Sequence, residues 1–180
     1  MGAAQSPPEL HGERVVLRRA RTAQAQAIHD LVNTPEVLAW WVSYPMEQVV
    51  EDLTPDDEEF VIFTIEPAAA EAGTEVVGLV QYSQELDPMY RHASIDVSIH
   101  PDHHRRGHAT DAIRTLARHL FDDLGHHRIT IDPAAHNAAA IACYEGLGFR
   151  PVGIMRDYEQ GVDGTFHDGL LMDLLAGELR

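Results

Sequence analysis

Residues 92–120 constrain the fold of this chain more than any other stretch. Apolar and polar side chains alternate through residues 92–100, and a spacing of two predicts a β-strand. Pro101 ends that strand, and a short loop over residues 103–108 follows. The next apolar residues recur at helical spacing, at Ala109, Ile113, Leu116, Ala117 and Leu120. The stretch therefore predicts a strand, a loop with two arginines and a glycine, and a helix.

The loop between this strand and this helix has the features of a phosphate-binding turn. The first N–H groups of a helix lack partners within the helix, and the helix dipole adds partial positive charge there. Gly107 lets the backbone approach a ligand closely, and Arg105 and Arg106 add charge. On these residues alone, a polyphosphate site and a plain connection with hydrated arginines explain the pattern equally well.

Length, hydropathy and cysteine content predict one cytoplasmic domain. The chain has 180 residues, enough for a single hydrophobic core, and a single cysteine, which excludes an internal disulfide. No apolar run is long enough to span a bilayer, and residues 1–8 lack the pattern of a signal peptide. We expect residues 1–12 to be a loose tail and residues 13–180 to form the domain.

Charge restricts the partners of the chain. The net charge is −16 with histidines neutral, and nucleic-acid binding needs a basic footprint instead. An acidic field attracts cations, although solubility alone also explains it. The twelve histidines include two adjacent pairs, which lack the spacing of metal ligands. We therefore expect no nucleic-acid or membrane partner and no metal site.

The remaining pattern predicts an α+β fold. A helix separates strands 92–100 and 127–132, so these two strands should be parallel neighbours in a mixed, mostly antiparallel sheet with helices on both faces. Thr22 is the expected N-cap of the first helix, and residues 56–59 form an acidic run. The other expected strands are 14–20, 60–65, 76–82, 149–158 and 166–175, and the other helices are 22–33, 35–41, 45–53 and 137–147.

Two segments resemble the GNAT acetyltransferase superfamily. Residues 104–109 are similar to its acyl-CoA signature, Gln/Arg-x-x-Gly-x-Gly/Ala, with His104 at the first position and Arg105 where many members have glycine. Residues 132–149 resemble the segment Asn-x-x-(Ala)-x-x-x-Tyr-x-x-x-Gly-Phe, with Asn137 and Tyr144 in place. The two matches stand in the family's order, and the resemblance covers nearly all of residues 12–177.

The resemblance implies that strands 92–100 and 127–132 splay apart around acetyl-CoA. The N–H of Val97 would polarise the acetyl carbonyl, Asn137 would bind the pantetheine arm, and Tyr144 would protonate the departing thiolate. Without the resemblance, Tyr144 suits a packed core and Asn137 suits helix initiation. The implied acetyl-CoA residues are Val97, Ser98, Ile99, His104, Arg105, Arg106, Gly107, His108, Ala109, Thr110, Asn137 and Tyr144.

Two aspartates at unusual positions bear on the acceptor substrate. Asp96 lies within a strand, where aspartate is disfavoured, and Asp132 ends the expected neighbouring strand. Two such carboxylates repel unless a cation lies between them or one is protonated. Asp132 before a proline also suits a turn, whereas an unpaired Asp96 on a buried face would be destabilising.

These positions are similar to those of aminoglycoside 6′-N-acetyltransferases, a subgroup of the superfamily that confers antibiotic resistance. Ile95-Asp96, Asp132-Pro133 and the pair Trp40-Trp41 carry the resemblance, whereas Val97-Ser98 and the acidic run depart from the subgroup. It implies Asp96 and Tyr144 as catalytic residues, with the 6′-amine as first acceptor and a 2′-amine next. The implied substrate-binding residues are Trp40, Trp41, Asp96 and Asp132, although both tryptophans also suit a core.

Two other functions stay open. The chain length and the strand over residues 14–18 resemble ribosomal-protein acetyltransferases, which modify the N-terminal amine of a protein. A GNAT fold that only senses acyl-CoA is the third hypothesis. Asp96, Asp132 and Tyr144 argue against it, because a sensor needs neither a base nor a proton donor. The sequence also leaves a homodimer open.

Overall fold

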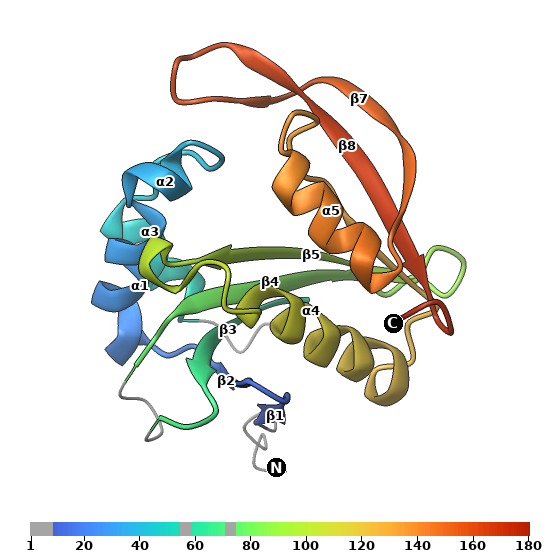
Figure 1. Ribbon diagram of the computed structural model, residues 1–180, viewed down its shortest axis with the longest axis horizontal. Coiled ribbons are helices and arrows are strands. Elements are labelled where there is room, and N and C mark those ends of the chain that lie inside the picture. Colours follow the sequence, from blue (N-terminus) through green and yellow to red (C-terminus); the bar gives the residue numbers. More distant parts are fainter. Residues whose placement is uncertain (1–8, 55–58, 71–74) are drawn as a thin grey trace.

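An eight-stranded sheet forms the centre of the computed structural model, which describes residues 9–54, 59–70 and 75–180 (Figure 1). The strand order is β1-β2-β3-β4-β5-β6-β8-β7. These strands are β1 (Leu10–His11), β2 (Val15–Arg19), β3 (Phe60–Pro67), β4 (Gly78–Glu85), β5 (His92–Ile99), β6 (Arg128–Ile131), β7 (Arg150–Gln160) and β8 (Phe166–Leu175). The expected α+β fold with a mixed, mostly antiparallel sheet is confirmed.

Helices cover both faces of the sheet, as the sequence predicted. Consecutive residues Leu79 and Val80 of β4 point to opposite faces and join different cores. Leu79 packs with α1 (Ala25–Val32) and α3 (Met46–Asp52), whereas Val80 joins the core beneath α4 (His108–Arg118). The further helical segments are α2 (Pro35–Leu38), α5 (Ala138–Leu147), two 3₁₀ turns, Thr22–Gln24 and Pro101–His103, and a π-helical turn, His119–Asp123, that extends α4.

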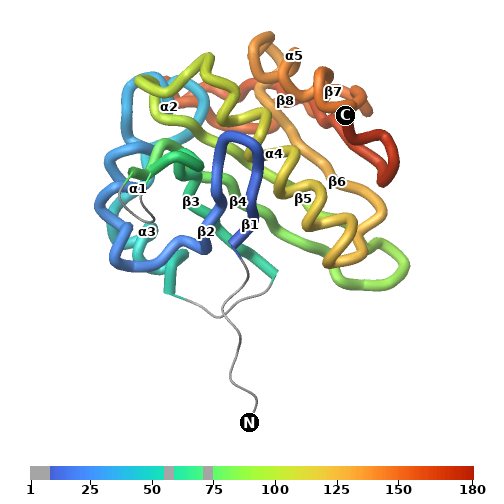
Figure 2. Tube along the Cα trace, turned by 60° about the horizontal axis from the view of Figure 1, so that its bottom comes forward, coloured from blue at the N-terminus to red at the C-terminus, as the bar shows by residue number. Residues whose placement is uncertain are grey.

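The parallel pairing of β5 and β6 is short. Only Ala93 with Ile129 and Ser94 with Thr130 are in register, whereas every other neighbouring pair of strands is antiparallel. Beyond Ser94, β5 stays beside β4, and β6 stays beside β8. The sheet therefore separates into an N-terminal and a C-terminal half, which Figure 2 shows on two sides of the molecule. The predicted splay between these strands is confirmed.

Two local expectations were wrong. Leu10 and His11 pair with β2 as β1, so residues 9–12 do not belong to a loose tail. Buried Asp111 stabilises this hairpin, because its carboxylate accepts the backbone N–H groups of Arg14 and Val15 at 2.7 and 3.1 Å. A two-residue strand leaves no alternation to detect. Thr22 is not an N-cap: a 3₁₀ turn begins there, and Gln24 accepts the N–H of Arg21 instead.

Two further features bear on the sequence predictions. Within the acidic run, residues 56–58 lie outside the described part of the chain, so the structure does not place that run. Over the described ranges, no helix combines the length and hydrophobicity that crossing a bilayer requires.

Candidate functional site

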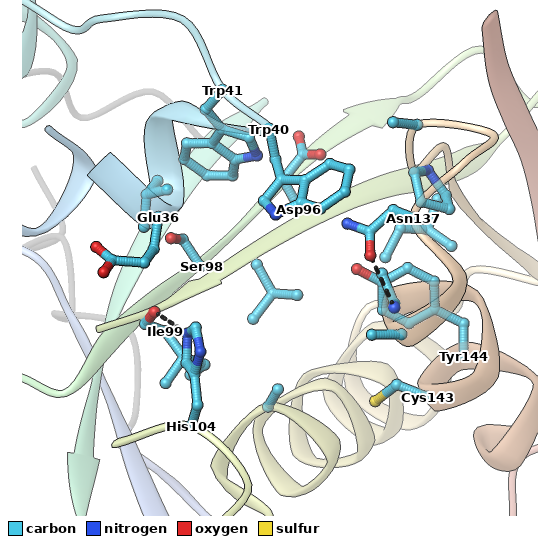
Figure 3. Close-up of a pocket in the computed structure, with 18 of the residues that line it drawn as sticks. Glu36, Trp40, Trp41, Asp96, Ser98, Ile99, His104, Asn137, Cys143 and Tyr144 are labelled. Carbon is cyan, nitrogen blue, oxygen red and sulfur yellow. Dashed lines mark hydrogen bonds between the residues drawn. The ribbon is translucent and has the colours of Figure 1, made fainter. Parts of the chain in front are cut away.

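A cleft of about 740 Å³ opens where β5 and β6 separate (Figure 3). The structure brings nearly all predicted site residues into its wall. Arg106 is the exception: it is exposed and does not line the cleft, although its neighbours do. The predicted residues that line it are Trp40, Trp41, Asp96, Val97, Ser98, Ile99, His104, Arg105, Gly107, His108, Ala109, Thr110, Asp132, Asn137 and Tyr144.

Backbone donors of β5 face this cleft. His100 donates its N–H to Val77 at 2.8 Å, on the β4 side. Because hydrogen bonds alternate sides along an antiparallel strand, the N–H groups of Val97 and Ile99 point away from β4, where β6 has already diverged. The Nε2 of His104 donates to the Ile99 carbonyl at 2.8 Å along the same edge. The edge therefore offers N–H donors to a ligand.

The loop after β5 presents the N-terminus of α4 to the cleft. Gly107 occupies the N-cap position with φ 81°, a conformation that glycine adopts without strain. His108, Ala109 and Thr110, in the first turn of α4, line the cleft. The side chain of Arg14 lies beside Gly107, since a Cβ there would be 3.4 Å from the Arg14 Cδ. Unpaired helix N–H groups and arginines together fit a polyphosphate.

Helix α5 supplies Asn137 and Tyr144. Asn137 caps the helix, because its Oδ1 accepts the N–H of Ala140 at 3.1 Å. Asn137 therefore acts as the N-cap of α5, while its amide nitrogen can donate a hydrogen bond to a ligand. The Tyr144 hydroxyl is directed into the cleft and has no hydrogen-bond partner in the part of the chain that the structure describes. Burial raises the pKa of Tyr144 above its usual range, and nearby Cys143 and Asp96 add to the rise.

Three carboxylates lie near one another in the cleft wall: Asp96, Asp132 and Glu159. A fourth, Glu36, also lines the cleft. The side chain of Asp96 is open to the cleft, and Gln81 Nε2 lies 3.5 Å from its Oδ2. The surrounding walls remove the Asp96 carboxylate from bulk water and, together with repulsion from Asp132, raise its pKa to about 6. Burial and Asp132 also raise the pKa of Glu159. Asp96 therefore faces a cleft rather than a core.

Tyr158 and Glu159 are site residues that sequence reasoning missed. A hydrogen bond to Asp132 and partial burial raise the pKa of Tyr158 to about 12. Consecutive strand residues normally point to opposite faces, yet both of these line the cleft. A register irregularity between Met155 and Glu159, with Asp157 at φ 48°, redirects β7 here. The sequence carries little signal for such a bulge.

The two tryptophans differ in environment. Trp40 is 41% exposed, and its ring lies 5.3 Å from that of His136, which lies 5.7 Å from His167 on β8. Trp41 lines the cleft and also packs against the core beneath α1 and α3. An aromatic wall beside carboxylates suits a cation. Among the described residues, no three His, Cys, Asp or Glu side chains are grouped to hold a metal ion.

Comparisons with known proteins agree with this geometry. Residues 14–150 match the family model of the acetyltransferase (GNAT) domain. The chain is 26% identical over 170 residues to spermidine N(1)-acetyltransferase of Vibrio cholerae, covering 92% of this chain and 95% of that protein. A crystal structure of spermidine N-acetyltransferase from Vibrio cholerae, in complex with CoA and spermine, is 25% identical with a TM-score of 0.79 over 92% of this chain and 97% of that one.

A shorter segment matches a different acetyltransferase. Over 82 residues the chain is 38% identical to the ribosomal protein bS18-alanine N-acetyltransferase of Escherichia coli, covering 44% of this chain and 52% of that protein.

Proposed function

Because the chain belongs to the GNAT acetyltransferase family, whose members take the acetyl group from acetyl-CoA, we propose that it acetylates a primary amine of a small polycation. One observation carries the proposal: Asp96, Asp132 and Glu159 lie close together in the wall of a cleft that also presents the N–H groups of β5 and α4. The N–H groups suit the anionic phosphates of acetyl-CoA, and the carboxylates suit the ammonium groups of the substrate.

The donor half of the cleft holds acetyl-CoA. The first turn of α4, with Arg105 and Arg14 nearby, binds the pyrophosphate, and the amide nitrogen of Asn137 binds the pantetheine arm. The N–H of Val97 donates to the acetyl oxygen and stabilises the negative charge that develops there when the amine attacks. A fixed donor needs no reorganisation at that moment.

Asp96 acts on the reacting amine. An ammonium ion cannot attack a carbonyl, so it must first lose a proton. With its pKa raised to about 6, Asp96 is a better base than an ordinary carboxylate while remaining mostly ionised at neutral pH. It takes the proton directly or through a water molecule. Asp132, hydrogen-bonded to Tyr158, holds another ammonium group of the substrate.

Tyr144 acts on the leaving group. Its raised pKa keeps the phenol protonated at neutral pH, and its hydroxyl faces the cleft. The phenol therefore donates its proton to the sulfur as the carbon–sulfur bond breaks, and the released product is neutral coenzyme A thiol.

Two kinds of polycation remain candidates. Relatives act on spermidine, which favours a polyamine. The motifs Ile95-Asp96 and Asp132-Pro133 favour an aminoglycoside, with the 6′-amine first and a 2′-amine next. The local match to an alanine N-acetyltransferase supports a third acceptor, the N-terminus of a protein. Each of these reactions consumes acetyl-CoA, which supports a cytoplasmic location for the protein.

A coenzyme A release assay distinguishes these acceptors. Purified full-length protein is given acetyl-CoA with spermidine, with aminoglycosides bearing either a 6′- or a 2′-amine, and with a peptide that begins with alanine. We expect acetylation of a polycation and little turnover of the peptide. A preference for an uncharged peptide N-terminus would overturn the proposal, and absence of turnover with every amine would favour the acyl-CoA sensor.

A further inference from the structure

A second cleft of about 360 Å³ lies on the side of the sheet that carries α1 and α3. It meets the first cleft at four shared residues: Trp40, Trp41, Asp96 and Glu159. None of the steps proposed above uses it. Because Asp96 borders both clefts, a molecule whose amine reacts at Asp96 can extend its remaining atoms into this second space.

Apolar side chains line much of the second cleft. They come from α1, from α3 and the residues on either side of it, and from strands β3 and β4. The apolar lining residues are Ile28, Val32, Val42, Val49, Leu53, Ile62 and Leu79. Against these seven side chains a hydroxyl-bearing sugar ring would lose its water without gaining hydrogen bonds, whereas a chain of methylene groups would gain by burial.

Of the three carboxylates that line the second cleft, only Asp52 does not also line the first. It is half-buried and accepts a hydrogen bond from the Tyr44 hydroxyl and another, at 2.9 Å, from Gln48 Nε2. Both donors are neutral, and no cation contacts Asp52 in the described residues. The two donors orient the carboxylate but leave its negative charge uncompensated. A half-buried charge of this kind favours a cationic ligand.

We propose that the second cleft holds the non-reacting arm of the substrate, a hydrocarbon chain that ends in an ammonium ion bound by Asp52. The inference rests on the proposed function and narrows it: the acceptor is a linear diamine or polyamine rather than an aminoglycoside. Trp40 and Trp41, shared by both clefts, contact the cationic segment where the arm turns past Asp96.

The test compares α,ω-diamines with n-alkylamines of equal chain length, from diaminopropane and propylamine to diaminooctane and octylamine. Wild-type kcat/KM should favour the longer diamines over their matched monoamines. Asp52→Asn should reduce this preference by about tenfold or more, since a hydrogen bond to a charged group is lost. Glu47→Gln is the matched control, because it removes one exposed charge from the same helix outside the cleft.

A second variant protects the test against misfolding. Leu53→Trp fills the cleft without altering Asp52 or Asp96, and it should shift the preference toward shorter diamines. An unchanged diamine preference in Asp52→Asn would overturn the inference, as would faster turnover of an aminoglycoside than of every diamine. If no amine is acetylated, the proposed function has failed; calorimetric binding of diaminohexane that is lost in Asp52→Asn would still support the arm site.

Discussion

The surroundings that make a charged Asp96 unfavourable in the free protein also favour the binding of an ammonium ion beside it. Its carboxylate lies within a strand beside Asp132 and Glu159, where restricted hydration and then repulsion from Asp132 raise its pKa to about 6. That environment penalises the charged form in the absence of a ligand, yet it is the environment that an arriving ammonium ion would neutralise. Electrostatic strain and substrate attraction therefore come from the same three carboxylates.

We expect Asp96→Asn to lower kcat/KM by about a hundredfold or more, roughly 3 kcal/mol of transition-state stabilisation. The amide keeps the shape of the side chain but cannot accept a proton from the amine. Steady-state kinetics with one polyamine measures the loss, and acetyl-CoA binding should be nearly intact. Asp132→Asn is the comparison: if it is the more damaging change, the roles of the two aspartates are reversed.

The same substitution should stabilise the fold at neutral pH. Folding raises the pKa of Asp96 from its usual 3.8 to about 6, so the folded protein holds this proton more tightly than the unfolded chain. Its contribution is complete below pH 3.8 and is lost as the pH rises through 6. Asp96→Asn carries no charge at this position at any pH. Above pH 6 its melting temperature should therefore exceed that of the wild-type protein. The gap should close on acidification; a gap independent of pH would contradict this assignment.

Tyr144→Phe should reduce kcat more than it weakens acetyl-CoA binding. The ring keeps its contact with Phe149, whose centroid lies 6.0 Å away, so packing survives while the proton donor is lost. General acid catalysis typically contributes on the order of a hundredfold. Turnover at saturating substrate and the acetyl-CoA dissociation constant separate the two effects. A kcat within about a factor of two of wild type would make Tyr144 a packing residue.

At the scale of elements, the strand, loop and helix over residues 92–120 form the proposed acetyl-CoA site. Their prediction succeeded because each boundary has a local cause: Pro101 ends the strand, and Gly107 supplies the positive φ before α4. The β7 wall was missed because a bulge placed Tyr158 and Glu159 there, and no periodic pattern encodes that geometry. Similarly, β1 depends on a distant contact with Asp111.

Gly107→Val should raise the dissociation constant of acetyl-CoA by about tenfold or more. The branched side chain disfavours φ 81° and occupies space beside the first turn of α4 and Arg14. Gly125→Val is the control, because Gly125 also has a positive φ, of 71°, but lies outside the cleft with nothing within 4 Å of a Cβ. Calorimetry measures the acetyl-CoA affinity of both variants. If Gly107→Val and Gly125→Val both bind acetyl-CoA as tightly as wild type, Gly107 does not contact the phosphates.

At the scale of the whole molecule, the sheet joins two halves through two residue pairs of β5 and β6. The N-terminal half supplies Asp96 and the tryptophans, and the C-terminal half supplies Asp132, Tyr144 and Glu159. Sequence reasoning could anticipate the splay only through family resemblance, since the strand alternation of either segment is the same whether the strands stay paired or diverge. The cleft exists because β5 and β6 pair over only two residues each before they diverge.

The net charge of −16 should attract a polycationic substrate to the cleft from a distance. A polycation approaching the cleft moves toward Asp96, Asp132, Glu159 and Glu36 through an acidic field, which raises its local concentration. Salt screens exposed charges over about 10 Å at 0.1 M, so the KM for a polyamine should rise with ionic strength. The rise should be shallower for a monoamine of the same length, which carries fewer charges, while kcat at saturation changes little. A KM for the polyamine that does not respond to salt would mean that short-range contacts alone capture the substrate, and that the acidity of the chain serves another purpose.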